Sequence, residues 1–433
     1  MNEMTLGVIG LLVVLALFLT GIELGVAMAV VGFVGFSYRV SLQAGLTLVA
    51  QDILDTFSSY GFTVIPLFVL MGQIAFNAGI AKRLYDSGHK FVGHIPGGLA
   101  MATVVGTTAF KAICGSSIAT SATFASVAIP EMDRYGYQRK LSTGIVATVG
   151  TLGILMPPSG VMIIFAMVTE LSISRLFLAG IIPGLVIALS FIVVIYGWCK
   201  INPSIGPRGE RSTWKARMAS LPDVIWVAII FILVIGGLMQ GFFTPTEAGS
   251  VGTFAVLLLC LAKRQLGFKG FVKSVGESLR TSCMVLLLLV GSTILGHFLA
   301  ITKIPMVTAD WIVNLPLDRY VIMVLICLIY LLGGSFIDDI AFMVLATPIF
   351  FPAIIKLGFD PIWFGMIISV TMMIGVVIPP MALNVFVVKN ITGESFGVVY
   401  SGVYPFLISL LIGGILLFLF PQLALFLPTR LMG

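Results

Sequence analysis

The chain has 433 residues, of which 59% are hydrophobic and only 10% are charged. Because an ordinary soluble domain carries roughly 25% charged residues, this composition excludes a soluble protein and predicts an all-α protein that crosses a lipid bilayer many times. The net charge of +6 comes from basic residues in short loops between apolar segments. We therefore attribute it to orientation in the membrane and expect no nucleic-acid partner.

The first apolar segment, residues 5–37, predicts two short spans separated by a break at Thr20–Glu23. No Lys or Arg precedes this segment, so it lacks the basic start of a cleaved signal peptide and we expect it to remain in the protein. A basic cluster follows at Lys82, Arg83 and Lys90. By the positive-inside rule this cluster is expected to face the cytoplasm.

Residues 97–130 come next and predict a re-entrant hairpin. The segment lies between two basic loops that are both expected in the cytoplasm, so the chain must enter the membrane and return on the same side. The turn is expected at "CGSS", residues 114–117, where a glycine and two serines suit a break between helices. Two tightly spaced full spans are the alternative.

Residues 141–169 predict a span that is broken in its middle by "TLGILMPPSG", residues 151–160. Proline lacks an amide donor and its ring clashes with the preceding turn, so carbonyl oxygens before Pro157 are freed. Inside hydrocarbon such a break persists only where protein or a watery cavity satisfies the freed groups. The break therefore predicts a cavity, and a simple kink is the alternative interpretation.

The remainder of the chain predicts a return span, a cytoplasmic linker, three further spans, a second hairpin that turns at "GGSFIDD", and a second broken span around "IGVVIPPMALN". In chain order these elements are expected at residues 176–198, 199–217, 223–241, 247–263, 281–302, 320–354 and 361–390.

Residues of the same type recur at a nearly constant spacing in the two parts of the chain. Five of them lie 222 residues apart, which pairs Gly153, Pro157, Pro158, Gly180 and Pro183 with Gly375, Pro379, Pro380, Gly402 and Pro405. The pairs Gly115 and Gly334, and Ser116 and Ser335, lie 219 residues apart.

This spacing predicts two repeats, residues 1–217 and residues 218–433, each with about five spans and one hairpin. An odd number of spans turns the second repeat upside down, so the repeats are expected to be inverted and both chain termini to lie outside.

The two breaks together predict a transport site. Freed carbonyl oxygens, with serine or threonine hydroxyls, suit Na⁺, and the N-terminal ends of the half-helices that follow suit an anion. Two broken helices at corresponding places in inverted halves are the sequence sign of a binding site near the middle of the membrane.

The hairpin "AICGSSIATSATFASVAIPEM", followed by "GTLGILMPPS" and then "GIIPGL", resembles the large membrane subunit of tripartite ATP-independent periplasmic (TRAP) transporters. The resemblance covers essentially the whole chain. It implies Na⁺-coupled secondary import of an organic acid across the bacterial inner membrane, in which the hairpin domain moves as an elevator. It also implies two separate partners, a small membrane subunit with four helices and a periplasmic binding protein that delivers the carboxylate.

Other classes are weighed against this resemblance. A stand-alone Na⁺-coupled dicarboxylate or citrate carrier would share the hairpins and the breaks, and it is the alternative. A membrane enzyme would need a catalytic motif such as HExxH or GxSxG within the spans, and the sequence has neither. We therefore expect a transporter and no enzyme.

Lys111 departs from the small or apolar residue that is more usual in the first hairpin of this family. It lies about 14 residues into its arm, or roughly 20 Å at the helical rise, and is expected deep in the membrane. Two interpretations stay open for this buried charge. It is a counter-charge for a carboxylate substrate, or it forms a salt bridge with Asp338 or Asp339.

The resemblance and the internal repeat together assign residues to the substrate and to about two transported Na⁺ ions. The substrate residues are expected to be Lys111, Asn384, Ser117 and Ser159. The first Na⁺ is expected at Ser116, Thr120, Gly153, Met156 and Pro157. The second is expected at Gly334, Ser335, Asp338, Thr371 and Gly375. Each hydroxyl has the alternative of bonding back to its own helix.

Overall fold

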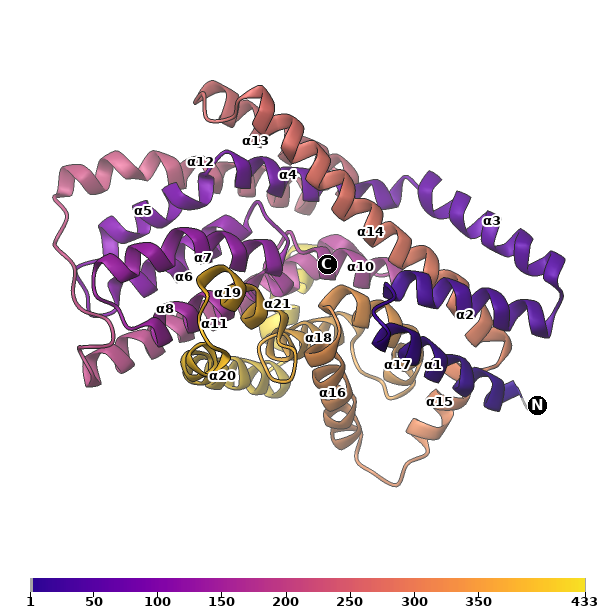
Figure 1. The fold of residues 1–433 in the computed structure, drawn as a ribbon. Coiled ribbons are helices and arrows are strands. Elements are labelled where there is room, and N and C mark those ends of the chain that lie inside the picture. The colour runs from indigo at the N-terminus through magenta and orange to yellow at the C-terminus, as the bar shows by residue number, and fades with distance from the viewer. Residues whose placement is uncertain (1–2, 433) are drawn as a thin grey trace.

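The computed structural model describes residues 3–432, and these residues form helices and loops without a strand (Figure 1). The predicted all-α fold is confirmed. Eight of the described helices are long and apolar enough to cross a membrane, or nine if the bent pair Leu42–Ser58 and Gly61–Asn77 counts as one span. Several shorter apolar helices accompany them.

The first five α-helices are arranged around two interruptions. Their bounds are α1 Glu3–Leu19, α2 Leu24–Arg39, α3 Leu42–Ser58, α4 Val64–Asn77 and α5 Ile80–Val92, with the short 3₁₀ helix η1, Gly61–Thr63, before α4. The chain breaks between α1 and α2 where the sequence predicts it, at Thr20–Glu23. At the second interruption the chain bends by 57° between α3 and the η1–α4 segment.

The first hairpin and the first broken span follow directly. Helices α6 (Gly98–Lys111) and α7 (Ser117–Arg134) are the arms of the hairpin. The broken span consists of α8 (Arg139–Val149), the single turn α9 (Leu152–Leu155) and α10 (Gly160–Thr169). The long helix α11, Ile173–Ile201, then completes this part of the chain.

The second part of the chain has the same order of elements. Its helices are α12 Trp214–Met239, α13 Pro245–Ala262, α14 Phe268–Ile301, α15 Ile304–Val313, α16 Arg319–Phe336, α17 Asp339–Lys356, α18 Pro361–Gly375, α19 Leu383–Thr392, α20 Phe396–Leu419 and α21 Gln422–Met432. Helices α16 and α17 are the arms of a second hairpin, and α18 and α19 are the halves of a second broken span.

Two connections differ from the sequence-based expectation. The segment between α11 and α12 covers only residues 202–213, so it is shorter than the expected linker. Helix α14 begins at Phe268, well before the span expected from residue 281. The early turns of α14 are basic and polar, and a charged helix that continues out of the membrane looks like a loop to a reading based on hydropathy. The Lys273–Glu277 pair at i, i+4 spacing, with 3.7 Å between Nζ and Oε1, supports these turns.

The two parts of the chain exchange equivalent contacts. Helix α2 packs along α14, while its counterpart α13 packs along α4. Both contacts use a glycine from a matching pair, since a Cβ atom on Gly25 would lie 2.9 Å from the Leu288 Cα and one on Gly249 would lie 3.1 Å from the Leu67 Cβ. Reciprocal contacts of this kind are what an approximate two-fold axis between two repeats produces.

The molecule divides into helices that flank the hairpins and helices that belong to them. In Figure 1, α14 runs diagonally across one side of the molecule beside α2 and α3, with α4, α12 and α13 toward its other end. The hairpin arms α6 and α7 lie on the left of this view, and α16 and α17 lie at the lower right of centre. We call α2, α4, α13 and α14 the scaffold helices.

Candidate functional site

The tip of the first hairpin is the unwound segment 112–116 between α6 and α7. Ser116 caps α7, because its Oγ accepts a hydrogen bond of 3.2 Å from the Ala119 amide. Thr120 donates to the Ser116 carbonyl at 2.8 Å, which is the back-bond that the sequence leaves open as an alternative. Ser117 instead reaches across to the second hairpin, where its Oγ donates to Asp339 Oδ2 at 3.2 Å.

Lys111 is the last residue of α6 and its side chain is completely buried. Its Nζ donates a hydrogen bond of 2.6 Å to the carbonyl oxygen of Ser116. The ion pairs found among residues 3–432 do not include Lys111. A charge near the middle of a membrane costs on the order of 3 kcal/mol, so the tip carbonyl is a stabilising contact for this ammonium group.

The first break lies beside this tip and is entirely buried from Thr151 to Ser159. Met156 ends the turn of α9 in an extended conformation, and the two prolines follow with a cis peptide bond between them. Ser159 donates to the Ile154 carbonyl at 2.7 Å and caps α10. Gly153 faces Lys111, since a Cβ atom there would lie 2.0 Å from the lysine Nζ.

The tip of the second hairpin carries two acidic residues. Asp338 is the N-cap of α17, where its Oδ1 accepts hydrogen bonds of 3.2 Å and 3.4 Å from the Ile340 and Ala341 amides. Asp339 is buried and accepts the bond from Ser117. The two hairpin tips therefore meet through a serine and an aspartate that occupy equivalent positions, the first residues of α7 and α17.

The second break brings the other predicted residues together. A Cβ atom on Gly375 would lie 3.0 Å from the Gly334 carbonyl carbon and 3.1 Å from the Leu331 carbonyl oxygen, so the break and the tip are in backbone contact. Ser335 and Thr371 donate to carbonyls of their own helices, at 2.7 Å and 2.9 Å. These hydroxyl oxygens keep lone pairs with which a cation can bind.

The same backbone contact joins the tip to the break in both halves. In the first half the Gly160 amide donates to the Gly115 carbonyl at 3.4 Å. In the second half the Met381 and Ala382 amides donate to the Ser335 carbonyl at 3.2 Å and 3.4 Å. Each hairpin is thus attached to the half-helix that follows the break beside it.

Asn384 lies outside this arrangement. It is completely buried on α19, and its side-chain amide donates to the Ala147 carbonyl of α8 at 3.3 Å. Its Oδ1 has no hydrogen-bond partner among the described residues. The contact joins the broken spans of the two halves.

A cavity of about 390 Å³ lies where the hairpin tips face the scaffold helices. Its polar wall includes four residues from the tips: Ser116, Ser117, Asp338 and Asp339. Pro158 and Gly160 of the first break also line it, so the first turns of α7, α10 and α17 converge on one space. Lys111 and Asn384 do not line this cavity.

The opposite wall comes from α4 and α14, and the sequence interpretation did not include its residues. Gln73 on α4 and Glu277 and Thr281 on α14 face the cavity together with apolar residues such as Phe68 and Met284. Asn77 donates to Glu277 Oε2 at 3.1 Å. A polar cluster on α14 was the available signal, but the expected loop at these residues concealed it.

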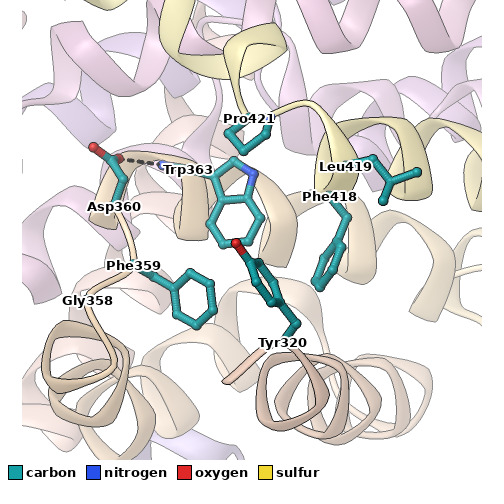
Figure 2. A pocket seen from close by; sticks show the side chains of 8 residues that line it. All are labelled: Tyr320, Gly358, Phe359, Asp360, Trp363, Phe418, Leu419 and Pro421. Atoms are coloured by element: carbon teal, nitrogen blue, oxygen red, sulfur yellow. Dashed lines mark hydrogen bonds between the residues drawn. The ribbon is translucent and has the colours of Figure 1, made fainter. Parts of the chain in front are cut away.

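A larger cavity of about 480 Å³ lies far from the predicted residues along the chain (Figure 2). Four aromatic side chains, Tyr320, Phe359, Trp363 and Phe418, surround it in Figure 2, and Asp360 beside them caps α18 by accepting a 2.9 Å bond from the Trp363 amide. Aromatic side chains gather in this way at membrane–water interfaces. None of the predicted site residues lines this cavity.

Comparison with known proteins identifies the sequence neighbourhood of the chain. A family model described as "Tripartite ATP-independent periplasmic transporter, DctM component" matches residues 11–423. The chain is 35% identical over 383 residues to the C4-dicarboxylate TRAP transporter large permease protein DctM of Pseudomonas aeruginosa, covering 88% of this chain and 89% of that protein. It is 30% identical over 422 residues to the sialic acid TRAP transporter large permease protein SiaM of Vibrio cholerae, covering 97% of each.

A solved structure shares the fold. The YdaH transporter of Alcanivorax borkumensis aligns with a TM-score of 0.65 over 88% of this chain and 89% of its own, at 12% sequence identity. At that identity the similarity concerns the fold alone. The relatives named above are transporter permeases, in keeping with the expectation of transport rather than catalysis.

Proposed function

The chain belongs to the DctM component family of tripartite ATP-independent periplasmic transporters, and from that premise we propose that it imports an organic acid by secondary transport driven by Na⁺. We place it in the bacterial inner membrane with both termini on the periplasmic side. A small four-helix membrane subunit and a periplasmic binding protein that hands over the substrate complete the proposed transporter.

The cavity between the hairpin tips and the scaffold is the observation that carries this proposal. Its volume of about 390 Å³ is at the lower end of the ~300–1,000 Å³ typical of ligand pockets, which favours a small carboxylate. The N-terminal ends of α7, α10 and α17 reach it, and such helix ends favour anions. The acidic residues at the second tip favour a cation in the same place, so cation and carboxylate are expected to bind together.

The position of the cavity supports an elevator movement. One wall belongs to the hairpins and the breaks, and the other belongs to α4 and α14. When a domain that holds the substrate slides against a fixed scaffold, the substrate is best bound at the boundary between the two. We therefore propose that the hairpins and the half-helices attached to them move together, while α4 and α14 remain with the scaffold.

Transport into proteoliposomes tests this function. The purified complex with its small subunit, supplied with the binding protein and a panel of radiolabelled carboxylates, is expected to accumulate one of them only when an inward Na⁺ gradient is imposed. Accumulation without Na⁺ would contradict the proposed coupling. Full activity in the absence of the binding protein would favour the stand-alone carrier instead.

A further inference from the structure

We propose that the ammonium group of Lys111 permanently occupies the cation site of the first hairpin tip, so that the protein transports a single Na⁺, bound at the second tip. This inference rests on the proposed Na⁺-driven function and specifies how many ions that function uses. It replaces the expectation of two transported Na⁺ ions with one ion and one built-in charge.

The ammonium group lies among the groups expected to hold the first Na⁺. It donates a hydrogen bond of 2.6 Å to the carbonyl oxygen of Ser116 at the tip. It also lies against Gly153 of the break, where an added Cβ atom would be 2.0 Å from Nζ. Unwound backbone of this kind is where transporters bind Na⁺. A lysine ammonium is a compact charge with three donors and no acceptor, so it satisfies the same oxygen atoms that a bound cation would.

The ammonium is poorly placed for the two roles that the sequence suggests for it. Its side chain is completely buried and does not line the cavity of about 390 Å³, so it does not face a substrate there. It also forms no ion pair with Asp338 or Asp339 within the 4.0 Å limit applied to the described residues. Its link to an acid is indirect, through Ser116 and the Ser117–Asp339 hydrogen bond.

The second tip has no comparable built-in cation. At the spacing of 219 residues that relates Ser116 to Ser335, the counterpart of Lys111 is Tyr330. Tyr330 is also completely buried, but it is neutral and its hydroxyl bonds to Thr347 at 3.2 Å. The two aspartates lie at this tip and Gly334 and Gly375 bring its backbone against the break. Negative charge without a tethered cation is the arrangement that calls for a mobile one.

A tethered cation changes the stoichiometry of transport. Because Lys111 stays attached to the tip, it returns with the moving domain in every cycle and carries no charge across the membrane. The number of Na⁺ ions moved per substrate, and the net positive charge moved inward, are therefore each lower by one than if both tips bound Na⁺.

Equilibrium binding of radioactive Na⁺ to the purified complex with its small subunit tests the inference. We expect the wild-type protein to bind one Na⁺ per copy. Lys111→Ala is expected to bind two, because the vacated space beside the Ser116 carbonyl then accepts an ion. Lys111→Met is the matched control and is expected to remain at one, since its apolar side chain fills the same space.

Two Na⁺ ions bound to the wild-type protein would overturn the inference, as would a single ion bound to a Lys111→Ala protein that still copurifies with the small subunit. If Lys111→Ala does not assemble, the ratio of Na⁺ to substrate flux in wild-type proteoliposomes decides instead, with one supporting the inference and two contradicting it. Absence of Na⁺ binding in all three proteins would instead refute the proposed function itself.

Discussion

The two hairpin tips share a backbone plan but carry opposite charges. Each tip accepts hydrogen bonds from the half-helix beyond the neighbouring break, at the Gly115 carbonyl in the first half and the Ser335 carbonyl in the second. The first tip holds a buried ammonium group, whereas the second holds two carboxylates. The prolines of the first break are buried, and those of the second are exposed. Similar backbones have thus been fitted with different side chains, which indicates that the two ion sites do different work.

This difference has a consequence for the energy available to transport. At a tenfold Na⁺ gradient and about 100 mV, each Na⁺ supplies about 1.4 plus 2.3, or roughly 3.7 kcal/mol, and a monovalent carboxylate gives back about 2.3. Two ions would leave about 5 kcal/mol for accumulation. One ion leaves about 1.4 kcal/mol, which supports only about tenfold accumulation. A transporter of this kind would depend on its binding protein to capture scarce substrate.

The largest effect is expected from removing negative charge at the second tip. Asp339→Asn keeps the size of the side chain but removes the charge that we assign to holding Na⁺. Losing one member of a buried charge pair costs about 3 kcal/mol, so the Na⁺ concentration for half-maximal uptake should rise about 100-fold. Glu131→Gln removes one negative charge from an ion pair at the end of α7 and serves as control. An equal shift in both variants would show that overall charge, and not the tip, is responsible.

The next effect tests the contact between Gly153 and Lys111. Gly153→Ala should destabilise the protein by about 2 kcal/mol, because the new methyl group overlaps with the ammonium group in a packed interior. The same substitution in a Lys111→Ala background should have almost no additional effect, since the nearest atoms to the methyl group all belong to Lys111. Thermal unfolding of the four proteins of this double-mutant cycle measures the coupling. Additive effects would show that the two residues do not meet.

A smaller effect is expected at the contact between the two tips. Ser117→Ala removes the hydrogen bond to the Asp339 carboxylate, and bonds to charged groups contribute about 1.5 kcal/mol, so uptake at limiting Na⁺ should fall about tenfold. Ser126→Ala, on the same helix but with its hydroxyl bonded to the Ala122 carbonyl, should transport normally. Normal transport by Ser117→Ala would remove this contact from the mechanism.

The smallest effect is expected at the first tip. Ser116→Ala removes the cap of α7, which should lower stability by about 1 kcal/mol. It leaves the backbone carbonyl that accepts the bond from Lys111, so the Na⁺ dependence of uptake should be unchanged. Uptake measured against Na⁺ concentration, together with the melting temperature, checks both parts. A raised Na⁺ requirement would indicate that the first tip binds a Na⁺ ion after all.

The sequence predicts the framework of this site because proline and glycine act locally. The Pro-Pro pairs and the Gly-Ser tips disrupt helices wherever they occur, and their regular spacing along the chain makes them recognisable as a repeat. The helix breaks lie at these residues in the structure, between α9 and α10 and between α18 and α19. The break between α1 and α2 was predictable for the same reason.

The contents of the site depend on tertiary packing and were less accessible. The direction of the Lys111 side chain follows from the position of Ser116 and Gly153 after the chain has folded, and the sequence alone leaves its partner open. Glu277 enters the cavity because α14 continues as a helix into a basic segment that looked like a loop. Asn384 bonds to α8 of the other half, a contact that neither its neighbours in sequence nor the repeat indicates.

A structure of the complex with its small subunit, determined with Na⁺ and a transported carboxylate bound, tests the central claim most directly. We predict the carboxylate in the cavity between the Ser117 and Asp339 tips and the scaffold residue Gln73. A single cation is predicted near Gly334 and Gly375, with the Lys111 ammonium still on the Ser116 carbonyl. A Na⁺ ion bound to that carbonyl, or a substrate bound away from the hairpin tips, would contradict the account.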